Sequence, residues 1–425
     1  MQSVAFGSCN RQSLPQDHWA RIHALVRPQA FLWTGDAVYA KDNSLAALDR
    51  AYINLTSSSE YAAFAANLSL IDGVYDDHDY GVNDGGSSVA LKPERKERYV
   101  RFLEASNPHP LSQHLDAVRA LRAHEGLYHS TDIRLQAGAA GDAESAVVKV
   151  IFLDTRTFRS DHIVRSLGEL KLPLTPLLAA AVRAGYTMLL GYGRDYGGDV
   201  LGEEQARWLD ETLATSTADF HVVVSSIQLL TVNPVVESWG HFPRAKAALL
   251  QTMKHCDPRG LLFLSGDVHH AELSSLDFTR SNSREPVYEF TSSGLTHSCG
   301  STLCPLMLGV FRQHRVPRDK HLNHSLSSGN VYSGRNFGSI RLVSRGELNV
   351  RIFSLQDGEP VLEQSVRSAG ERAQAGLADP VLSVTYYDLP VLSTVDVVWI
   401  LWAASLAALL VALLAAKVRR GMCGK

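Results

Sequence analysis

The stretch VAFGSCNRQSLPQDHWARIHALVRPQAFLWTGD, residues 4–36, contains two short apolar runs on either side of an amphipathic segment. The runs VAF and AFLWT are uninterrupted by polar residues, as expected of strands that are buried on both faces. Between them, DHWARIHALV repeats its apolar residues at the spacing of a helix that packs on one side. A strand, a helix and a second strand in this order predict an α/β fold.

The same alternation continues along the chain. Further buried strands are predicted within residues 147–156, 219–230 and 259–270. Amphipathic helices are predicted over residues 44–55, 60–69, 92–105, 202–216 and 243–256. Beyond these, segments 286–294, 337–355 and 360–366 are typical of antiparallel strands, with SRGE as a hairpin turn. The fold class predicted from this order is mixed α/β.

Composition narrows the class of protein. The chain has 425 residues, of which 45% are hydrophobic and 20% charged, so a sizeable core is available. A net charge of −3 gives no electrostatic support for a nucleic-acid partner. Five cysteines are too few for a disulfide framework, although Cys299 and Cys304 are close enough to bridge a small loop in an oxidising compartment.

The C-terminal region contains an uncharged apolar run, VVWILWAASLAALLVALLAA, at residues 397–416. At about 1.5 Å per residue, a helix of this length crosses a hydrocarbon core of roughly 30 Å. Because KVRR follows directly, we expect residues 417–425 to be a short basic cytoplasmic tail. The large domain, residues 1–366, would then be extracellular or lumenal, joined to the membrane by a stalk at 367–396. A buried C-terminal helix is the alternative interpretation of the apolar run.

The location of the large domain depends on further signals. The first residues, MQSVAFGSC, do not resemble a signal peptide, so a lumenal domain implies one upstream of this sequence. A tail-anchored protein with a cytosolic domain is the alternative. Sequons at Asn54, Asn67 and Asn323 are compatible with a lumenal domain and a glycoprotein.

Ligand-type side chains follow four of the predicted strands. The four endings are Gly7-Ser8-Cys9, Gly35-Asp36 with Tyr39 nearby, Asp76-Asp77-His78, and Gly266-Asp267-Val268-His269-His270. Turns are rich in glycine and aspartate for conformational reasons, so one such ending would mean little. Ligands in open α/β sheets bind beyond the carboxyl ends of the strands. Four endings with this chemistry therefore predict one shared site.

The residue types at these endings favour metal chemistry. Thiolate, imidazole and carboxylate suit transition metals, carboxylates also bind calcium, and a tyrosine within reach suggests a phenolate on a ferric-type ion. Two metals can clamp a phosphoryl group and activate a water. The sequence contains no GxSxG, GxxxxGK[ST] or HExxH motif, which disfavours serine hydrolases, P-loop NTPases and zincins. An oxidoreductase is disfavoured because no haem or flavin motif is present.

Several motifs occur in a specific order: GSC, GDxxY, DDHDYGxND, LDTR, LGxEQxxWL, SSIQ, SGDVHHAEL, SSGLTH and NFG. In this order they resemble the alkaline phosphatase D (PhoD-like) metallophosphatases of the calcineurin-like metallophosphoesterase superfamily. The resemblance extends from about Val4 to about Phe353. It implies a four-layer sandwich with two mixed sheets flanked by helices, and hydrolysis of phosphate mono- and diesters. It also implies two metal ions, iron and calcium.

The resemblance assigns roles position by position. The implied metal ligands are Cys9, Asp36, Tyr39, Asn83, Asp267 and His269. The candidate catalytic residues are His78, Asp77 and Arg156. His78 would hydrogen-bond the phosphate or protonate the leaving group, and Arg156 would grip phosphate oxygens. The chain departs from secreted bacterial members in having DDHDYG in place of DDHE and no N-terminal β domain, so substrate preference and metal identity do not transfer directly.

Each assignment has a simpler structural alternative. Cys9 would otherwise be a small buried hydrophobe, Tyr39 a core aromatic and Asp77 a helix cap. Arg156 would otherwise form a structural ion pair with Asp154 or another acid. For Trp239, packing under a loop is favoured over lining a cleft.

Two functions remain in competition. The first is a membrane-anchored, metal-dependent phosphoesterase with a phosphate-ester substrate. The second is a membrane-anchored, non-catalytic surface protein that uses the same fold for binding. A degenerate copy would have lost ligands, whereas all of the implied ligands are present, which favours the enzyme.

Overall fold

The computed structural model describes residues 2–107, 112–138, 144–163, 182, 185, 196–231, 236–276, 286–300, 322–323 and 331–368. The predicted membrane span at 397–416, the basic tail and nearly all of the stalk lie outside these residues. In the part of the chain that is described, no helix combines the length and apolarity needed to cross a bilayer.

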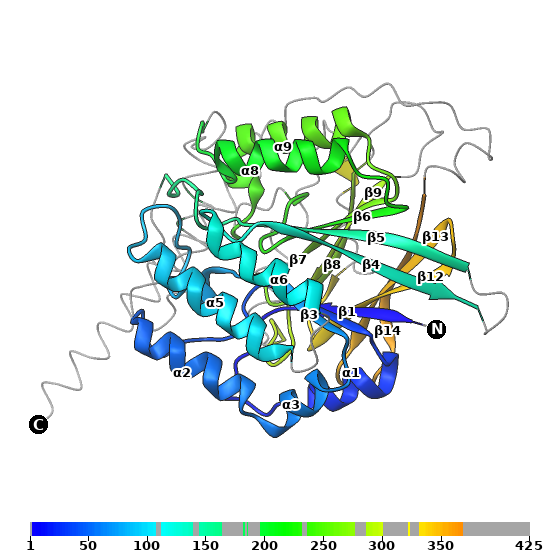
Figure 1. Cartoon of the computed structure of the whole chain (residues 1–425), viewed down its shortest axis with the longest axis horizontal. Helices are drawn as coiled ribbons and strands as arrows, with labels where there is room; N and C mark the ends of the chain where they lie inside the picture. The colour runs from blue at the N-terminus through cyan, green and yellow to red at the C-terminus, as the bar shows by residue number, and fades with distance from the viewer. Residues whose placement is uncertain are drawn as a thin grey trace, which may run out of the picture.

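Two mixed β-sheets form the centre of the molecule (Figure 1). The first has the order β14-β13-β12-β1-β2-β3, and the second the order β10-β8-β9-β7-β6-β5-β4, with β11 paired to β8. The first sheet contains β1 (Ser3–Gly7), β2 (Ala30–Thr34), β3 (Leu70–Val74), β12 (Asn336–Ser344), β13 (Glu347–Ser354) and β14 (Pro360–Arg367). The second contains β4 (His129–Ala137), β5 (Glu144–Leu153), β6 (Phe220–Ser225), β7 (Leu261–Ser265), β8 (Ala271–Leu276), β9 (Val287–Ser292), β10 (Leu322–Asn323) and β11 (Val331–Tyr332).

The opening strand–helix–strand stretch forms as predicted. Strands β1 and β2 pair in parallel, and β3 joins β2 in parallel. In the second sheet, β5, β6 and β7 are parallel neighbours. Strand β12 pairs antiparallel with β1, so the C-terminal strands extend the sheet that the N-terminal strands begin. The predicted hairpin turn lies between β12 and β13.

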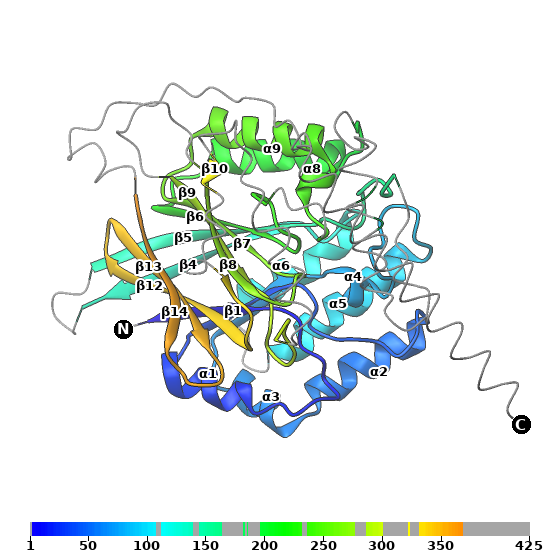
Figure 2. The ribbon, with the colours of Figure 1, turned by 180° about the vertical axis from the view of Figure 1, so that it is seen from behind.

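Helices cover the outer sides of both sheets, and Figure 2 shows the same layers from behind. The described helices are α1 (His18–Val26), α2 (Leu45–Thr56), α3 (Ser59–Ala65), α4 (Asp77–Tyr80), α5 (Lys92–Ser106), α6 (Ser112–Ala120), α8 (Gly202–Ala214) and α9 (Pro243–Cys256), with the short 3₁₀ turns η1 (Leu121–Ala123) and η3 (Trp239–His241); of these, α4 lies at the end of β3 and not on the outer side of a sheet. Helices α8 and α9 lie on one side, and α1, α2 and α3 on the other (Figure 1). The predicted architecture of two mixed sheets flanked by helices is therefore confirmed.

Strand alternation divides the core into two parts. In β5, Val150 and Phe152 belong to the large core that contains residues of both sheets. Ile151 and Leu153, which point the opposite way, pack in a second core with residues of α8 and α9. Because both faces of β5 are covered by apolar layers, its sequence is a nearly continuous apolar run.

Candidate metal centre

The strand endings meet where the two sheets approach each other. The Ser8 amide, at the end of β1, donates to the carbonyl of Ser292 in the second sheet at 3.1 Å. A Cβ at Gly266, after β7, would lie 2.5 Å from Ser8 Oγ and from Thr34 O, so this close approach requires glycine. The shared site that was predicted at one sheet edge thus forms between the edges of two sheets.

Four of the predicted ligands have left-handed backbone conformations. The φ angles are 61° at Cys9, 52° at Asp36, 70° at Asp267 and 56° at His269. Such conformations cost free energy for residues with a side chain and persist only where the surrounding structure enforces them, most often at functional sites. Each sharp turn aims a polar side chain beyond the end of its strand.

Cys9, Asp36 and Tyr39 are in mutual contact. Cys9 Sγ lies 3.5 Å from Asp36 Oδ2, and the Tyr39 hydroxyl donates to the same oxygen at 2.7 Å. Ser293 Oγ lies 3.0 Å from Cys9 Sγ. Burial raises the pKa of the Cys9 thiol, and it raises the pKa values of Asp36 and Tyr39 well above their usual range. A bound cation would oppose these shifts, because it stabilises the thiolate, carboxylate and phenolate forms.

The DDH segment brings more carboxylates to the same place. Oxygens of Asp36 and Asp77 and a ring nitrogen of His78 lie within 4.8 Å of one another, as do oxygens of Asp76, Asp77 and Asp267. Asp76 Oδ2 and Asp77 Oδ1 are buried without a hydrogen-bond partner. Burial is the largest cause that raises the pKa of Asp76, to about 6. Unpartnered buried carboxylate oxygens are costly, so this donor set fits cations.

The short helix α4 holds this segment in position, and its four residues are too few for periodicity to predict. Asp76 is its N-cap. Asp79 accepts hydrogen bonds at 3.1 Å from the amides of Ala37 and Val38, directly after Asp36. Asp79 therefore ties the DDH segment to the GD turn. Asp77 lies in the first turn of α4, and its Oδ2 accepts from the Asp84 amide at 2.8 Å.

Asn83 and His78 occupy less buried positions. Asn83 is half-buried in the turn after α4, and its ligand role stays a prediction. The His78 side chain is 32% exposed, and its Nε2 lies 3.9 Å from Asp77 Oδ1. Its ring centroid is 4.0 Å from that of Tyr39. His78 is thus adjacent to the carboxylates and open to solvent, as a group that meets substrate must be.

On the other side of the site lie two histidines, of which only His269 was predicted from sequence. The His269 amide donates to Ser293 Oγ at 2.8 Å, and its Nδ1 is buried without a partner. The His297 ring lies 4.5 Å from the His269 ring and 5.0 Å from the Tyr39 ring, measured between centroids. Burial lowers the pKa of His269 to about 4 and that of His297 to about 3. The position of His297 shortly after β9 is the signal that could have identified it.

Arg156 differs from its predicted role. It is fully buried, and its Nε donates to Asp76 Oδ1 at 2.7 Å. Its Nη1 donates to both carboxylate oxygens of Glu237, at 3.0 and 3.1 Å. This geometry matches the ion-pair alternative, with Asp76 and Glu237 as the acids. Asp154 accepts a hydrogen bond from the backbone amide of Arg156 and none from its guanidinium. A grip on phosphate stays a prediction that the observed hydrogen bonds do not favour.

Glu237 is the centre of a buried network that sequence analysis missed. Besides Arg156, it contacts His162 Nε2 at 2.8 Å and Arg159 Nη2 at 3.4 Å. Although burial opposes ionisation, Arg156 and Arg159 hold the pKa of Glu237 well below its usual range. Arg159 also donates to the carbonyl of Gly85 at 2.8 Å, which fixes the end of the Asn83 turn. Glu237 lies far from its partners in sequence, so no local pattern identifies it.

Nearby residues have packing roles. Trp239 is fully buried and donates from Nε1 to Ser225 Oγ at 3.0 Å, as favoured from sequence. His270, which was given no ligand role, is buried with Nδ1 2.9 Å from Val268 O and Nε2 3.4 Å from Glu272.

Comparison with known proteins agrees with this geometry. Residues 143–346 match the family model described as PhoD-like phosphatase. This match contains Arg156, Asp267 and His269, whereas Cys9, Asp36 and Tyr39 precede it. Alkaline phosphatase D of Bacillus subtilis (strain 168) is 29% identical over 107 residues, which cover 23% of this chain and 18% of that protein. The aligned region thus spans less than a fifth of the length of this curated relative.

Solved structures extend the likeness to the whole fold. A structure of PhoD aligns with a TM-score of 0.51 at 15% identity, covering 85% of this chain and 68% of that chain. The purple acid phosphatase PPD1 of yellow lupin (Lupinus luteus) aligns at 9% identity with a TM-score of 0.47, over 90% of this chain and 57% of that chain. Residues 143–346 are thus similar to the PhoD-like phosphatases, and the described fold is similar to that of PhoD.

Proposed function

We propose that this protein is a metal-dependent phosphoesterase that hydrolyses phosphate mono- or diesters with a metal-activated water. The observation that carries the proposal is the cluster of Cys9, Asp36, Tyr39 and the buried carboxylates, in which Asp76 Oδ2 and Asp77 Oδ1 have no hydrogen-bond partner. The PhoD-like match and the similarity to alkaline phosphatase D support the phosphate-ester substrate.

The residues present fit two cations. The thiolate of Cys9 and the phenolate of Tyr39 suit iron, whereas the carboxylates and the Asn83 amide suit calcium. Asp36 is the candidate bridge, because one oxygen contacts Cys9 and Tyr39 and the other accepts from the His78 amide at 3.3 Å. When bound, such cations lower the pKa of a coordinated water and neutralise charge on the phosphoryl group.

The side chains around the centre orient these groups. Asp79 holds the GD turn against the DDH segment. Arg156, which Glu237 also holds, donates to Asp76 Oδ1, and Asp76 Oδ2 has no hydrogen-bond partner. His78, which is accessible, would hydrogen-bond the phosphate or give a proton to the leaving group.

Metal analysis of the purified protein, combined with hydrolysis of an aryl phosphate before and after chelation, tests this function. We expect bound metal, turnover, and loss of turnover on chelation that metal addition reverses. Protein that binds no metal and shows no esterase activity after metal addition would contradict the proposal. That result would instead favour the non-catalytic binding protein.

We also propose that the domain lies outside the cytoplasm and is anchored by the apolar run at 397–416. Asn54 on α2 and Asn67 after α3 are both exposed, which makes their sequons accessible to glycosylation. Sensitivity of the cell-expressed protein to an N-glycosidase, lost in the Asn54→Gln, Asn67→Gln double variant, would support a lumenal domain. In intact vesicles whose cytosolic face is outward, a lumenal domain should be protected from protease. A digested domain with a protected tail would contradict the proposed orientation.

A further inference from the structure

A cationic side chain with free donors would help the proposed metal ions to hold a phosphate ester. Arg156, the candidate from sequence, has no such donors. All three nitrogens of the Arg156 guanidinium donate within the chain, to Asp76 and Glu237. Arg159, the next arginine along, donates to carbonyls of the Asn83 turn and contacts Glu237. Arg156 thus has no guanidinium nitrogen left for a substrate, and Arg159 is fully buried, so an exposed cation is a better candidate for a contact with substrate.

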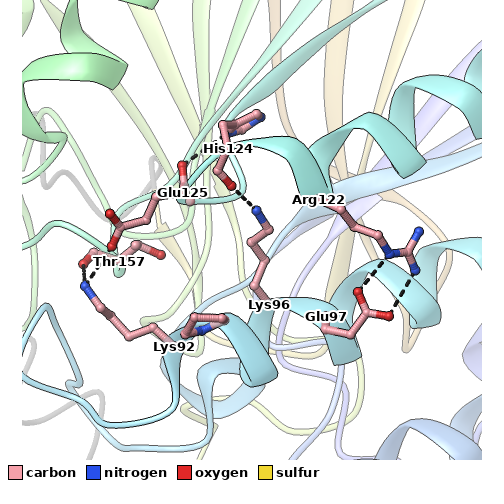
Figure 3. Close-up of a pocket in the computed structure, with 9 residues that line it drawn as sticks. Lys92, Lys96, Glu97, Arg122, His124, Glu125 and Thr157 are labelled. Carbon is pink, nitrogen blue, oxygen red and sulfur yellow. Dashed lines mark hydrogen bonds and ion pairs between the residues drawn. The ribbon is translucent and has the colours of Figure 1, made fainter.

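A basic cavity of about 640 Å³ near α5 also lacks a cation without a partner (Figure 3). Its Lys92 contacts Glu125 at 3.0 Å, and Lys96 donates to the carbonyls of Leu121 and His124. Its Arg122 is held by Glu97 at 2.8 Å. Because each of these cations already has an acceptor in the chain, this cavity offers no anion site.

Arg11 differs from all of these cations. It is exposed, and its Cζ lies 5.2 Å from the centre of the Tyr39 ring, in cation–π geometry. Tyr39 in turn donates to Asp36, so the exposed Arg11 side chain lies at the solvent-facing margin of the candidate metal centre, next to Tyr39; we call this margin the mouth of the centre. Among the described residues, no carboxylate forms an ion pair with Arg11.

The backbone of Arg11 is fixed although its side chain is exposed. Its amide donates to Thr296 Oγ1 at 2.7 Å, and that hydroxyl donates to the Cys9 carbonyl at 3.1 Å. The preceding residue, Asn10, donates from its amide to Asp36 O at 2.9 Å and from Nδ2 to Ala37 O at 3.1 Å. Arg11 is thus attached to the turns that carry the metal ligands, and only its side chain has freedom to move.

The rings next to Arg11 lead to the predicted ligands. The Tyr39 ring beneath the Arg11 guanidinium lies 5.0 Å from the His297 ring, and the His297 ring lies 4.5 Å from the His269 ring, measured between centroids. An anion bound next to Tyr39 and these histidines would therefore lie close to the Arg11 guanidinium.

We propose that Arg11 binds the phosphoryl oxygens of the ester at the mouth of the centre. This inference rests on the proposed phosphoesterase function. A guanidinium presents paired N–H donors that match two phosphate oxygens, and the Tyr39 ring positions it without consuming those donors. Arg11 would therefore be a substrate-binding residue that supplies the grip expected of Arg156.

The test compares Arg11→Gln and Arg11→Lys with Arg50→Gln, which removes a charge from an exposed position on α2. In the metal-loaded full chain, KM and kcat for an aryl phosphate and calorimetric binding of inorganic phosphate are measured. We expect Arg11→Gln to weaken phosphate binding and raise KM about 10- to 100-fold, as typical for a lost charged hydrogen bond. Arg11→Lys should recover part of the affinity, and Arg50→Gln should match the wild type.

The outcomes separate this inference from the proposed function. An active wild type with unchanged KM and phosphate affinity in Arg11→Gln overturns the role of Arg11 alone. A wild type that binds phosphate through Arg11 without hydrolysing esters overturns only the function. A wild type that neither binds phosphate nor turns over overturns both. Equal unfolding midpoints for the three variants and the wild type would show that the exposed substitution has not altered the fold.

Discussion

Two polar clusters lie side by side behind the strand endings, and they are balanced in opposite ways. Around Glu237, two arginines and a histidine surround one carboxylate, and Arg156 also neutralises Asp76. Around Asp36, the buried acids Asp76, Asp77 and Asp267 converge with two oxygens unpartnered. Positive side chains balance the carboxylates of the first cluster, whereas the second cluster lacks such partners. The first cluster therefore fits a structural role, and the second fits the binding of cations that we propose.

Asp36→Asn should have the largest effect, because it acts on the cluster that needs cations. If the carboxylate bridges the ions, the amide binds metal poorly, and turnover should fall by about 10³-fold or more. Steady-state kinetics together with metal content per chain measures both consequences. Retained activity with full metal content would refute the bridging role.

Glu237→Gln should have the largest effect on stability. It leaves Arg156, Arg159 and His162 buried without their shared carboxylate, and removing one partner of a buried ion pair costs about 3–5 kcal/mol. Denaturant unfolding in the presence of a chelator measures this without the contribution of bound metal. The control is Glu203→Gln on α8, where the lost partner of Arg207 is an exposed pair. Equal losses in the two variants would show that the Glu237 network contributes no special stability.

The same two clusters show what local sequence can reveal. Cys9, Asp36, Asp267 and His269 were identified because each directly follows an apolar run, and strand ends are a local signal. The partners of Arg156 are not local, because Asp76 and Glu237 are 80 and 81 residues away in sequence. The sequence could therefore predict that Arg156 lies at the end of a strand, but not that these two carboxylates bind its guanidinium. Helix α4 was missed because a four-residue helix has no period. The sheets were easier, since alternation and continuous apolar runs report burial directly.

In metal-free protein, Asp267→Asn should raise the free energy of unfolding, whereas Glu237→Gln should lower it, although both change a carboxylate to an amide. Burial and the charges of Asp76 and Asp77 raise the pKa of Asp267 well above its usual range, so its ionised form is unfavourable without a cation. We expect the variant to gain about 1 kcal/mol in the free energy of unfolding under chelation. With metal present, the variant should instead be less stable than the wild type. A loss of stability in chelator would contradict the contrast between the clusters.

The smallest expected effect on stability concerns a third polar cluster, formed by His129, Asp72 and the Leu127 carbonyl, whose charges are balanced within the chain. His129 in β4 lies with Nε2 2.9 Å from Asp72 Oδ1 in β3, and with Nδ1 2.9 Å from the carbonyl of Leu127. Both ring nitrogens face acceptors, so the imidazolium is the form that satisfies them. Burial opposes this charge, but Asp72 outweighs it and the pKa of His129 is raised above its ordinary value of 6.5.

The sign of the pH dependence follows from that shift. Between pH 6.5 and the raised pKa, the folded state holds a proton that the unfolded state has released, so stability falls as pH rises through this window. The slope approaches about 1.4 kcal/mol per pH unit, and the contribution is complete below pH 6.5. His129→Gln should reduce the slope relative to the wild type by up to about 1.4 kcal/mol per pH unit, whereas His255→Gln, at an exposed position on α9, should keep the wild-type slope. The comparison is made with the wild type because the buried carboxylates of the metal-free site also hold protons in this window. Unfolding free energies measured in chelator across neutral pH test this, and an unchanged slope in His129→Gln would refute the role of His129. His129 in β4 and Asp72 in β3 join the two sheets, and neither is a predicted metal ligand. The loss of His129 should therefore leave the metal content unchanged. This result would distinguish an ion pair that stabilises the fold from carboxylates that bind cations.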